Sequence, residues 1–274
     1  MADPISATLK DLRVAPGGAA GLAKRDTSDR LGLGDKVAGE ARRAELGEEL
    51  AQLHDRLWAE SERSVLLVLQ GMDTAGKDGA IKKVFRGLNP QGMHIASFKA
   101  PGDHELAHDY LWRIHAACPE RGQIGVFNRS HYEDVVAARI VGAADAKTCK
   151  RRFGHLRDFE RMLTDEGTTL AKVFLNISCD EQRARLQARL DDPTKRWKFK
   201  QDDLETRAQW SAYQRAYEEA ITATSTDDAP WYVVPADRKW VRDVAVASLL
   251  VSVLRTLDPQ YPKAEIDLDN IVVT

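Results

Sequence analysis

The chain has 274 residues, with 40 Lys or Arg, 42 Asp or Glu and a formal net charge of −2 at pH 7. This length suits one large domain, with or without an appended arm, and 43% hydrophobic with 30% charged residues is ordinary for a globular protein. The chain has no run of about 20 apolar residues, which excludes a membrane-spanning helix, and its slightly acidic balance argues against general nucleic-acid binding.

The first 35 residues are rich in Gly, Ala and charged side chains, and we expect a flexible arm, loose or draped over the surface. They have neither an apolar signal core nor the Arg-rich, acid-free composition of an organelle presequence, which favours a cytoplasmic protein. From Lys36 to Arg63, leucines recur at i, i+4, i+7 and i+11, a spacing that predicts a helix.

Beyond this helix, short apolar segments alternate with longer amphipathic ones. The predicted strands are Val65–Leu69, His94–Phe98, Ile124–Phe127, Leu170–Ile177 and Trp231–Val234. The predicted helices lie near Lys77–Gly87, Glu105–Ala117, Lys147–Asp165, Glu181–Arg189, Leu204–Thr224 and Asp237–Leu257. This alternation predicts an α/β fold with three layers, α/β/α, in which helices cover both faces of a central parallel five-stranded sheet.

A phosphate-loop pattern follows the first predicted strand. Gly71, Gly76 and Lys77 fit G-x-x-x-x-G-K between an apolar strand and an amphipathic helix. Backbone N–H groups from Asp73 to Lys77, including that of Ala75, would bind a phosphate at the helix N-terminus. The sequence therefore predicts a nucleotide- or phosphate-binding loop.

Two aspartates in this motif need separate explanations. A carboxylate beside bound phosphates is repelled unless a cation lies between them, so we interpret Asp73 as a magnesium ligand. Asp78 occupies the position at which such loops normally have Ser or Thr to hold Mg²⁺. We interpret Asp78 as a first-turn acid that favours the helix dipole.

The third predicted strand ends in Asn128-Arg129-Ser130. Arg129 would point at the crevice beyond the carboxyl ends of the strands, where α/β sheets bind ligands. A surface salt bridge is the alternative for this arginine. His131 is interpreted as a packed or hydrogen-bonded polar residue rather than a base.

The segment from His104 to His108 is a literal H-E-x-x-H, the zinc-peptidase signature with Glu105 as base. Both imidazoles would lie on one helix face. No third ligand follows at a suitable spacing, so we favour a surface helix start.

Between Lys147 and Lys200 there are 14 Lys or Arg and 8 Asp or Glu, an excess of 6. This excess indicates a local anion site, and a solvated helix face with ion pairs is the alternative. Its most basic part, from about Arg183 to Gln201, lies where a mobile lid would project. Cys118, Cys149 and Cys179 are few and widely spaced, which predicts reduced thiols.

Taken together, several segments resemble a family-2 polyphosphate kinase from about Leu31 to Leu257. They are "GMDTAGKDGAIKKV", "FKAPGDHELAHDYLWRIH", "GVFNRSHYEDVV", "DDPTKRWKFKQDDLETRAQWSAYQRAYEEAI" and "PWYVVPADRKWVRDVA". The resemblance implies a P-loop kinase fold like that of thymidylate kinase, with a helical lid at about 183–215. The domain would span residues 36–257, between the arm at 1–35 and a tail at 258–274.

The resemblance also implies residue roles. Lys77 and Arg129 would clamp phosphate as catalytic groups with Asp73, which would hold metal. Arg189 would grip the polyphosphate from the lid. The full predicted set of substrate-binding residues is Gly71, Ala75, Gly76, Asp78, Asn128, Glu133, Arg139 and Arg189.

One segment departs from the family pattern. Many members have Asp-Arg-Ser-Trp-Tyr-Asn where this chain has Asn128-Arg129-Ser130-His131-Tyr132-Glu133. Asn128 is a weaker magnesium ligand, and Glu133 supplies a carboxylate five residues on, so the predicted metal ligands are Asp73 and Glu133. This pattern resembles class III of the family, which phosphorylates both AMP and ADP.

The resemblance therefore implies reversible transfer of a phosphoryl group from inorganic polyphosphate to nucleoside mono- and diphosphates, with Mg²⁺ or alternatively Mn²⁺. Adenine nucleotides are the expected acceptors, with guanine nucleotides open, and a homo-oligomer is expected. Two alternatives stay open: an ATP-dependent nucleotide or nucleoside kinase of the thymidylate-kinase type, and a slowly hydrolysing P-loop regulator. The sequence lacks the guanine-reading N-K-x-D pattern that would favour the regulator.

Overall fold

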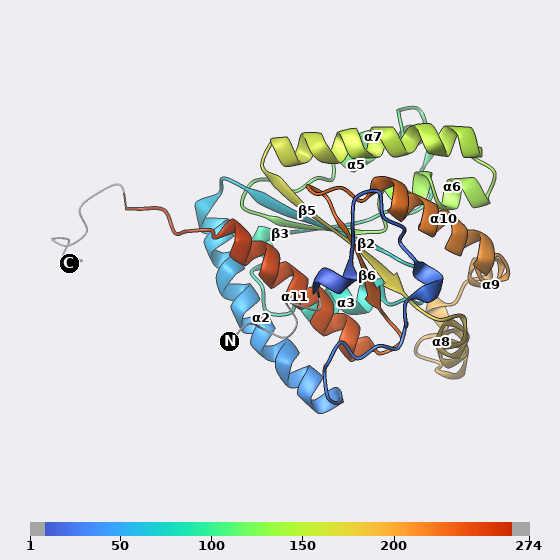
Figure 1. The fold of residues 1–274 in the computed structure, drawn as a ribbon, viewed down its shortest axis with the longest axis horizontal. Helices are drawn as coiled ribbons and strands as arrows, with labels where there is room; N and C mark the ends of the chain where they lie inside the picture. Colours follow the sequence, from blue (N-terminus) through green and yellow to red (C-terminus); the bar gives the residue numbers. More distant parts are fainter. Residues whose placement is uncertain (1–8, 265–274) are drawn as a thin grey trace.

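The computed structural model describes residues 9–264, and Figure 1 shows its fold as a ribbon. Within these residues one sheet has six strands in the spatial order β1-β6-β5-β2-β4-β3. The strands are β1 (Arg13–Val14), β2 (Ser64–Gln70), β3 (Met93–Ser97), β4 (Ile124–Asn128), β5 (Thr168–Asn176) and β6 (Trp231–Pro235). Strands β2 to β6 pair in parallel, and β1 pairs antiparallel to β6.

The five predicted strands are confirmed, each with ends within two residues of the prediction. The sheet is nevertheless mixed, because two residues from the N-terminal segment add β1 as a sixth strand. Every residue of β2 is buried. A strand covered on both faces is apolar throughout, which explains why Val65–Leu69 is a continuous apolar run.

Helices cover both faces of the sheet. The α-helices are α2 (Lys36–Glu60), α3 (Lys77–Val84), α4 (Asp103–Leu106), α5 (Trp112–His115), α6 (Ala137–Ile140), α7 (Ala146–Asp165), α8 (Cys179–Asp191), α9 (Gln201–Ala208), α10 (Trp210–Thr224) and α11 (Lys239–Leu257). The 3-10 helices are η1 (Leu22–Lys24), η2 (Pro90–Gly92), η3 (His131–Asp134) and η4 (Arg196–Lys198). Figure 1 shows α6, α7 and α10 on one side of the sheet and α2, α3 and α11 on the other.

Two predicted helices are each divided in the structure. Glu105–Ala117 was expected as one helix, but α4 and α5 are single turns separated at Asp109, whose carboxylate accepts the Leu111 N–H at 2.9 Å. Such a turn competes with helical hydrogen bonding. Leu204–Thr224 is divided at Gln209 into α9 and α10.

The expectation of a loose N-terminal arm is wrong for residues 9–35. The backbone N–H groups of Gly21 and Leu22 each donate at 2.8 Å to the Glu218 carboxylate on α10. Leu12 and Val14 are buried in the core. This segment is thus part of the folded domain, and residues 1–8 of the predicted arm lie outside the described residues. So do residues 265–274 of the predicted tail.

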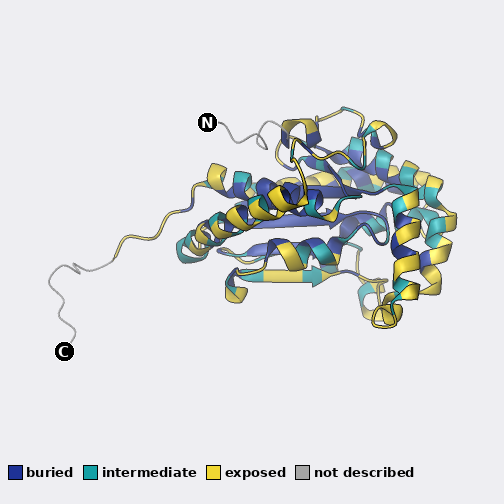
Figure 2. Cartoon of the chain, turned by 90° about the horizontal axis from the view of Figure 1, so that it is seen from below, coloured by how far each residue is buried: buried dark blue, intermediate teal, exposed yellow. Residues whose placement is uncertain are grey.

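Because the strands are parallel, the carboxyl ends of β2, β4 and β5 lie at one edge of the sheet. The loop to α3, the turn to η3 and the start of α8 all leave from this edge. Figure 2 shows the buried strands between partly exposed helices, with exposed helical segments at the end toward which the arrows point. No helix within residues 9–264 is long and apolar enough to cross a membrane.

Candidate active site

The loop between β2 and α3 turns sharply at three residues with positive φ. Gly71, Thr74 and Gly76 have φ angles of 152°, 64° and 104°. A Cβ on Gly71 would lie 2.9 Å from the Leu175 carbonyl oxygen, and one on Gly76 would lie 1.9 Å from Arg242 Nη1. Glycine is therefore needed at both positions, and the loop leads directly into the N-terminus of α3, a favourable place for a phosphate.

Lys77, the first residue of α3, is buried with its side chain folded back over the loop. Its ammonium donates to the carbonyl oxygens of Gly71 at 2.7 Å and Met72 at 3.4 Å. Burial lowers the pKa of Lys77, and the charge of Arg129 lowers it further, while Asp73 opposes the shift. A phosphate bound in the loop would relieve this unfavourable burial of positive charge.

Arg129 lies directly after β4 and faces the loop. Its backbone has a φ of 64°, which is uncommon for a residue with a side chain, and its N–H donates to Leu69 O at 3.1 Å. Its guanidinium Nη2 lies 2.8 Å from Asp73 Oδ1. Burial lowers the pKa of Arg129, but the charges of Glu133 and Asp73 outweigh it and raise the pKa overall.

Asn128 and Asp78 are joined by a hydrogen bond, in which Asn128 Nδ2 donates to Asp78 Oδ1 at 2.7 Å. Asp78 stands in the first turn of α3, as expected for an acid that favours the helix dipole. The bond shows a second role for Asp78, because it ties the start of α3 to the end of β4.

Glu133, on η3, completes the group of acids around the loop. The Gln70 amide, with its nitrogen turned toward Glu133, donates to Glu133 Oε1 at 3.0 Å and accepts from the backbone N–H and hydroxyl of Ser130 at 3.1 Å. Burial and then the charge of Glu133 raise the pKa of Tyr217 on α10 well above its usual value. Glu133 is therefore held in place by Gln70 of β2, and its charge acts on Tyr217 of α10.

Magnesium fits this set of donors. Mg²⁺ usually binds through one or two carboxylates together with substrate phosphates, rather than in an all-protein cage. Asp73 and Glu133 are oxygen donors near the same loop, and both act electrostatically on Lys77. Within residues 9–264 there is no cluster of three or more His, Cys, Asp or Glu that could hold a metal, so the protein would supply few ligands.

Arg139 and Arg189 lie in ion pairs on other elements. Arg139, on α6, pairs with Glu219 of α10. Arg189, near the end of α8, lies 3.5 Å from Asp203 Oδ2 and 3.5 Å from the Lys198 carbonyl oxygen. Arg189 is in the last turn of α8, within the segment expected to form a lid.

Arg185 and Arg242 support the loop from behind, and sequence reasoning missed both. Arg185, on α8, donates to the carbonyl oxygens of Thr74 at 2.9 Å and Ala75 at 3.1 Å, and also to that of Ala236 at 2.6 Å. Arg242, on α11, lies beside Gly76 of the loop, where its Nη1 would be 1.9 Å from an added Cβ. Arg185 falls within the basic segment, but nothing in its spacing distinguishes it from the exposed cations around it.

The H-E-x-x-H residues take part in local packing. Glu105 accepts the Gly102 N–H at 2.9 Å and so caps α4. The His108 ring stacks on Trp112 with ring centroids 4.2 Å apart, and His104 packs edge-on against the same indole. These contacts agree with the surface helix start favoured from the sequence.

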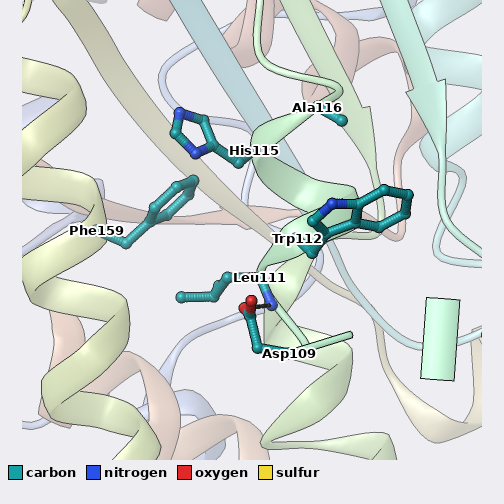
Figure 3. A pocket seen from close by; sticks show the side chains of 6 residues that line it. All are labelled: Asp109, Leu111, Trp112, His115, Ala116 and Phe159. Carbon is teal, nitrogen blue, oxygen red and sulfur yellow. Dashed lines mark hydrogen bonds between the residues drawn. The ribbon is translucent and has the colours of Figure 1, made fainter. Parts of the chain in front are cut away.

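A shallow cavity of about 380 Å³ lies between the α5 segment and α7, and Figure 3 shows its lining. Asp109, Leu111, Trp112, His115, Ala116 and Phe159 line it. None of these is a predicted site residue, so the cavity is distinct from the P-loop.

The loop, its buried lysine and the facing arginine, built on this sheet, place the chain among the P-loop phosphotransferases. Residues 34–262 match the sequence model of the family described as "Polyphosphate kinase 2 (PPK2)". The chain therefore belongs to the polyphosphate kinase 2 family.

Individual relatives agree with this assignment. An AMP/ADP-polyphosphate phosphotransferase of Meiothermus ruber is 49% identical over 97% of this chain and 100% of its own length. An ADP-polyphosphate phosphotransferase of Rhodopseudomonas palustris is 42% identical over 79% of each chain. The crystal structure of polyphosphate kinase 2 from Arthrobacter aurescens TC1 superposes with a TM-score of 0.91 at 46% identity, covering 94% of this chain and 93% of that one.

Proposed function

We propose that this protein transfers phosphoryl groups from inorganic polyphosphate to AMP and to ADP, as a class III member of its family. The names of the two relatives support polyphosphate as donor, and the relative that matches nearly the whole chain is named for both acceptors. The observation that carries the proposal is the buried ammonium of Lys77, inside a loop whose Asp73 pairs with the Arg129 guanidinium.

In this proposal the protein acts by binding, orientation and charge neutralisation, which is what phosphoryl transfer requires. Lys77 and the loop N–H groups hold the phosphate oxygens. Arg129 releases Asp73 and stabilises negative charge on the transferring group. Asp73, with Glu133, would hold Mg²⁺ or Mn²⁺, which when bound supplies further charge neutralisation between the phosphates.

We further propose that α8, η4 and α9 form the lid over the bound substrates. Arg196, Lys198 and Lys200 are exposed on this segment, and a polyphosphate chain has no base to recognise, so cations would guide it. The basic segment is not all available for this role. Lys172 is buried in the core, and Arg185 is buried behind the P-loop.

The test is an incubation with polyphosphate, Mg²⁺ and AMP or ADP, without ATP, followed by separation of the nucleotides. We expect ADP and then ATP from AMP, and ATP from ADP. A parallel reaction with ATP as the donor to AMP tests the ATP-dependent nucleotide kinase. Product formation only in that second reaction would contradict the proposal.

A further inference from the structure

Three ionisable side chains are buried together behind the turn that carries Arg129. His131, Glu160 and Lys172 are each at most 1% exposed. Lys172 Nζ lies 2.6 Å from Glu160 Oε2, and His131 Nε2 lies 3.1 Å from Glu160 Oε1. These residues come from η3, α7 and β5, so the cluster joins three separate elements.

Tyr132 closes the cluster. Its hydroxyl donates to Glu160 Oε1 at 2.8 Å and accepts from Lys172 Nζ at 3.1 Å. Lys172 also donates to the Thr224 carbonyl oxygen at 2.8 Å. We call His131, Tyr132, Glu160 and Lys172 the anchor network.

Stability alone does not explain why the anchor network is charged. Burial raises the pKa of Glu160, but Lys172 and His131 together outweigh burial and lower the pKa overall, so the carboxylate stays ionised in the network. Replacing a buried ion pair with well-packed apolar side chains is often neutral or stabilising. A charged network at this place is better explained by the geometry that its hydrogen bonds impose.

The hydrogen bonds of the network fix the turn that carries Arg129 and Glu133, two residues of the candidate site. His131 and Tyr132 open η3, Arg129 lies two residues before them and Glu133 directly follows. Arg129 has a left-handed backbone with φ of 64°. Such a conformation persists only where surrounding contacts enforce it.

The turn is in fact held from two sides. The Arg129 N–H is bonded to Leu69 O on β2 at 3.1 Å, which ties the turn to the sheet. On the opposite side the side chains of His131 and Tyr132 are bonded into the anchor network.

We propose that the anchor network is a positioning device that holds the turn so that the Arg129 guanidinium meets the transferring phosphoryl group. The inference rests on the proposed function for the reaction it serves. Its residues do not touch substrate. They act through the backbone of the turn, and their effect therefore depends on the presence of the Arg129 side chain.

Tyr132→Phe is the first test, because it removes the hydroxyl and keeps a ring to pack against Trp231, whose centroid lies 4.7 Å away. We expect kcat with AMP and polyphosphate to fall about 10-fold, which corresponds to about 1.4 kcal/mol, while KM for AMP changes less than about 2-fold. Ser64→Ala is the matched control. It breaks another buried hydroxyl pair, Ser64 with Thr168 at 2.9 Å. Both residues begin their strands, β2 and β5, at the end away from the P-loop, so kcat should stay unchanged.

A double mutant separates positioning from general stability. In the Arg129→Ala background, with kcat measured at high enzyme concentration, Tyr132→Phe should lower kcat by less than about 2-fold. A 10-fold loss in that background, or an unchanged kcat in Tyr132→Phe alone, would overturn the inference. An inactive wild type would count against the proposed function instead. The crystal structure of Tyr132→Phe would then decide the inference, since an Arg129 φ still near 64° would contradict it.

Discussion

Lys77 and Arg129 are the two cations closest to the expected chemistry, and each is held in a different way. The Lys77 ammonium is bonded to the carbonyl oxygens of its own loop, whereas the Arg129 guanidinium is paired with Asp73. The lysine is thus held by the loop backbone. The arginine is held by the Asp73 carboxylate, for which a bound metal ion would compete. At this scale the site is a set of charges that substrate phosphates and Mg²⁺ would rearrange.

Lys77→Ala should lower kcat/KM by more than about 100-fold with either acceptor, because in the proposed function the ammonium would contact phosphate and the helix does not need it for folding. Lys77→Arg should also be poor, since a planar guanidinium does not fit the place of a compact ammonium. Lys83→Ala, an exposed lysine on the same helix, is the control. Steady-state rates and circular dichroism check the prediction, and a folded, active Lys77→Ala enzyme would refute the role of the loop.

Asp73→Asn should raise the Mg²⁺ concentration for half-maximal rate by at least about 10-fold, because a neutral amide is a weaker ligand. Asn128→Ala should raise it far less, since Asn128 uses its amide to bond Asp78. Magnesium titrations of both variants decide this. Equal shifts would mean that Asp73 acts through its ion pair with Arg129 rather than through metal.

Glu133→Asn should lower kcat/KM for AMP more than kcat/KM for ADP. The loss with AMP should be about 5- to 150-fold, which corresponds to a lost contact of about 1–3 kcal/mol. AMP is one phosphate shorter, so a carboxylate acting through Mg²⁺ or water would help to hold it in line. Measuring kcat/KM for both acceptors checks this. Equal losses would assign Glu133 to the architecture of the turn, where Gln70 already binds it.

At the scale of elements, the P-loop is supported by helices that follow it late in the sequence. Arg185 on α8 bonds the loop carbonyls, and Arg242 on α11 fills the space beside Gly76. Because Arg185 lies on α8, the loop and the base of the proposed lid form one hydrogen-bonded unit.

Gly76→Ala tests this packing directly. The added Cβ would lie 1.9 Å from Arg242 Nη1 at a φ of 104°, so we expect a loss of stability of about 1–3 kcal/mol and a displaced loop. Gly47→Ala, on α2 with nothing within 4 Å of the new Cβ, is the matched control and should be neutral or stabilising. Denaturant unfolding and activity should separate the two variants, and equal behaviour would contradict the packing described here.

Elements defined by local periodicity were predictable from the sequence, and long-range supports were not. The strand Val65–Leu69 and its following loop are marked by an apolar run and by glycines. The Asp73–Arg129 pair joins residues 56 positions apart, and the bonds from Arg185 to the loop span more than 100. Such contacts depend on which strands become neighbours, and no local pattern encodes that order.

In the molecule as a whole, the N-terminal segment is another part whose long-range contacts the local sequence did not predict. Its Gly- and Ala-rich composition predicted a loose arm, yet Gly21 and Leu22 bond Glu218, nearly 200 residues away. The same helix, α10, carries Tyr217 beside Gln70 and Glu219 beside Arg139. The segment therefore packs on a helix that also contacts Gln70, the residue that bonds Glu133.

The proposed function makes inorganic polyphosphate itself the phosphoryl donor. The most direct measurement incubates the protein with uniformly ³²P-labelled polyphosphate, Mg²⁺ and unlabelled AMP, without ATP, and follows the label by chromatography. We expect label in ADP first and in ATP later, with none transferred by Lys77→Ala. Label that stays in polyphosphate, or leaves it only as inorganic phosphate, would contradict it.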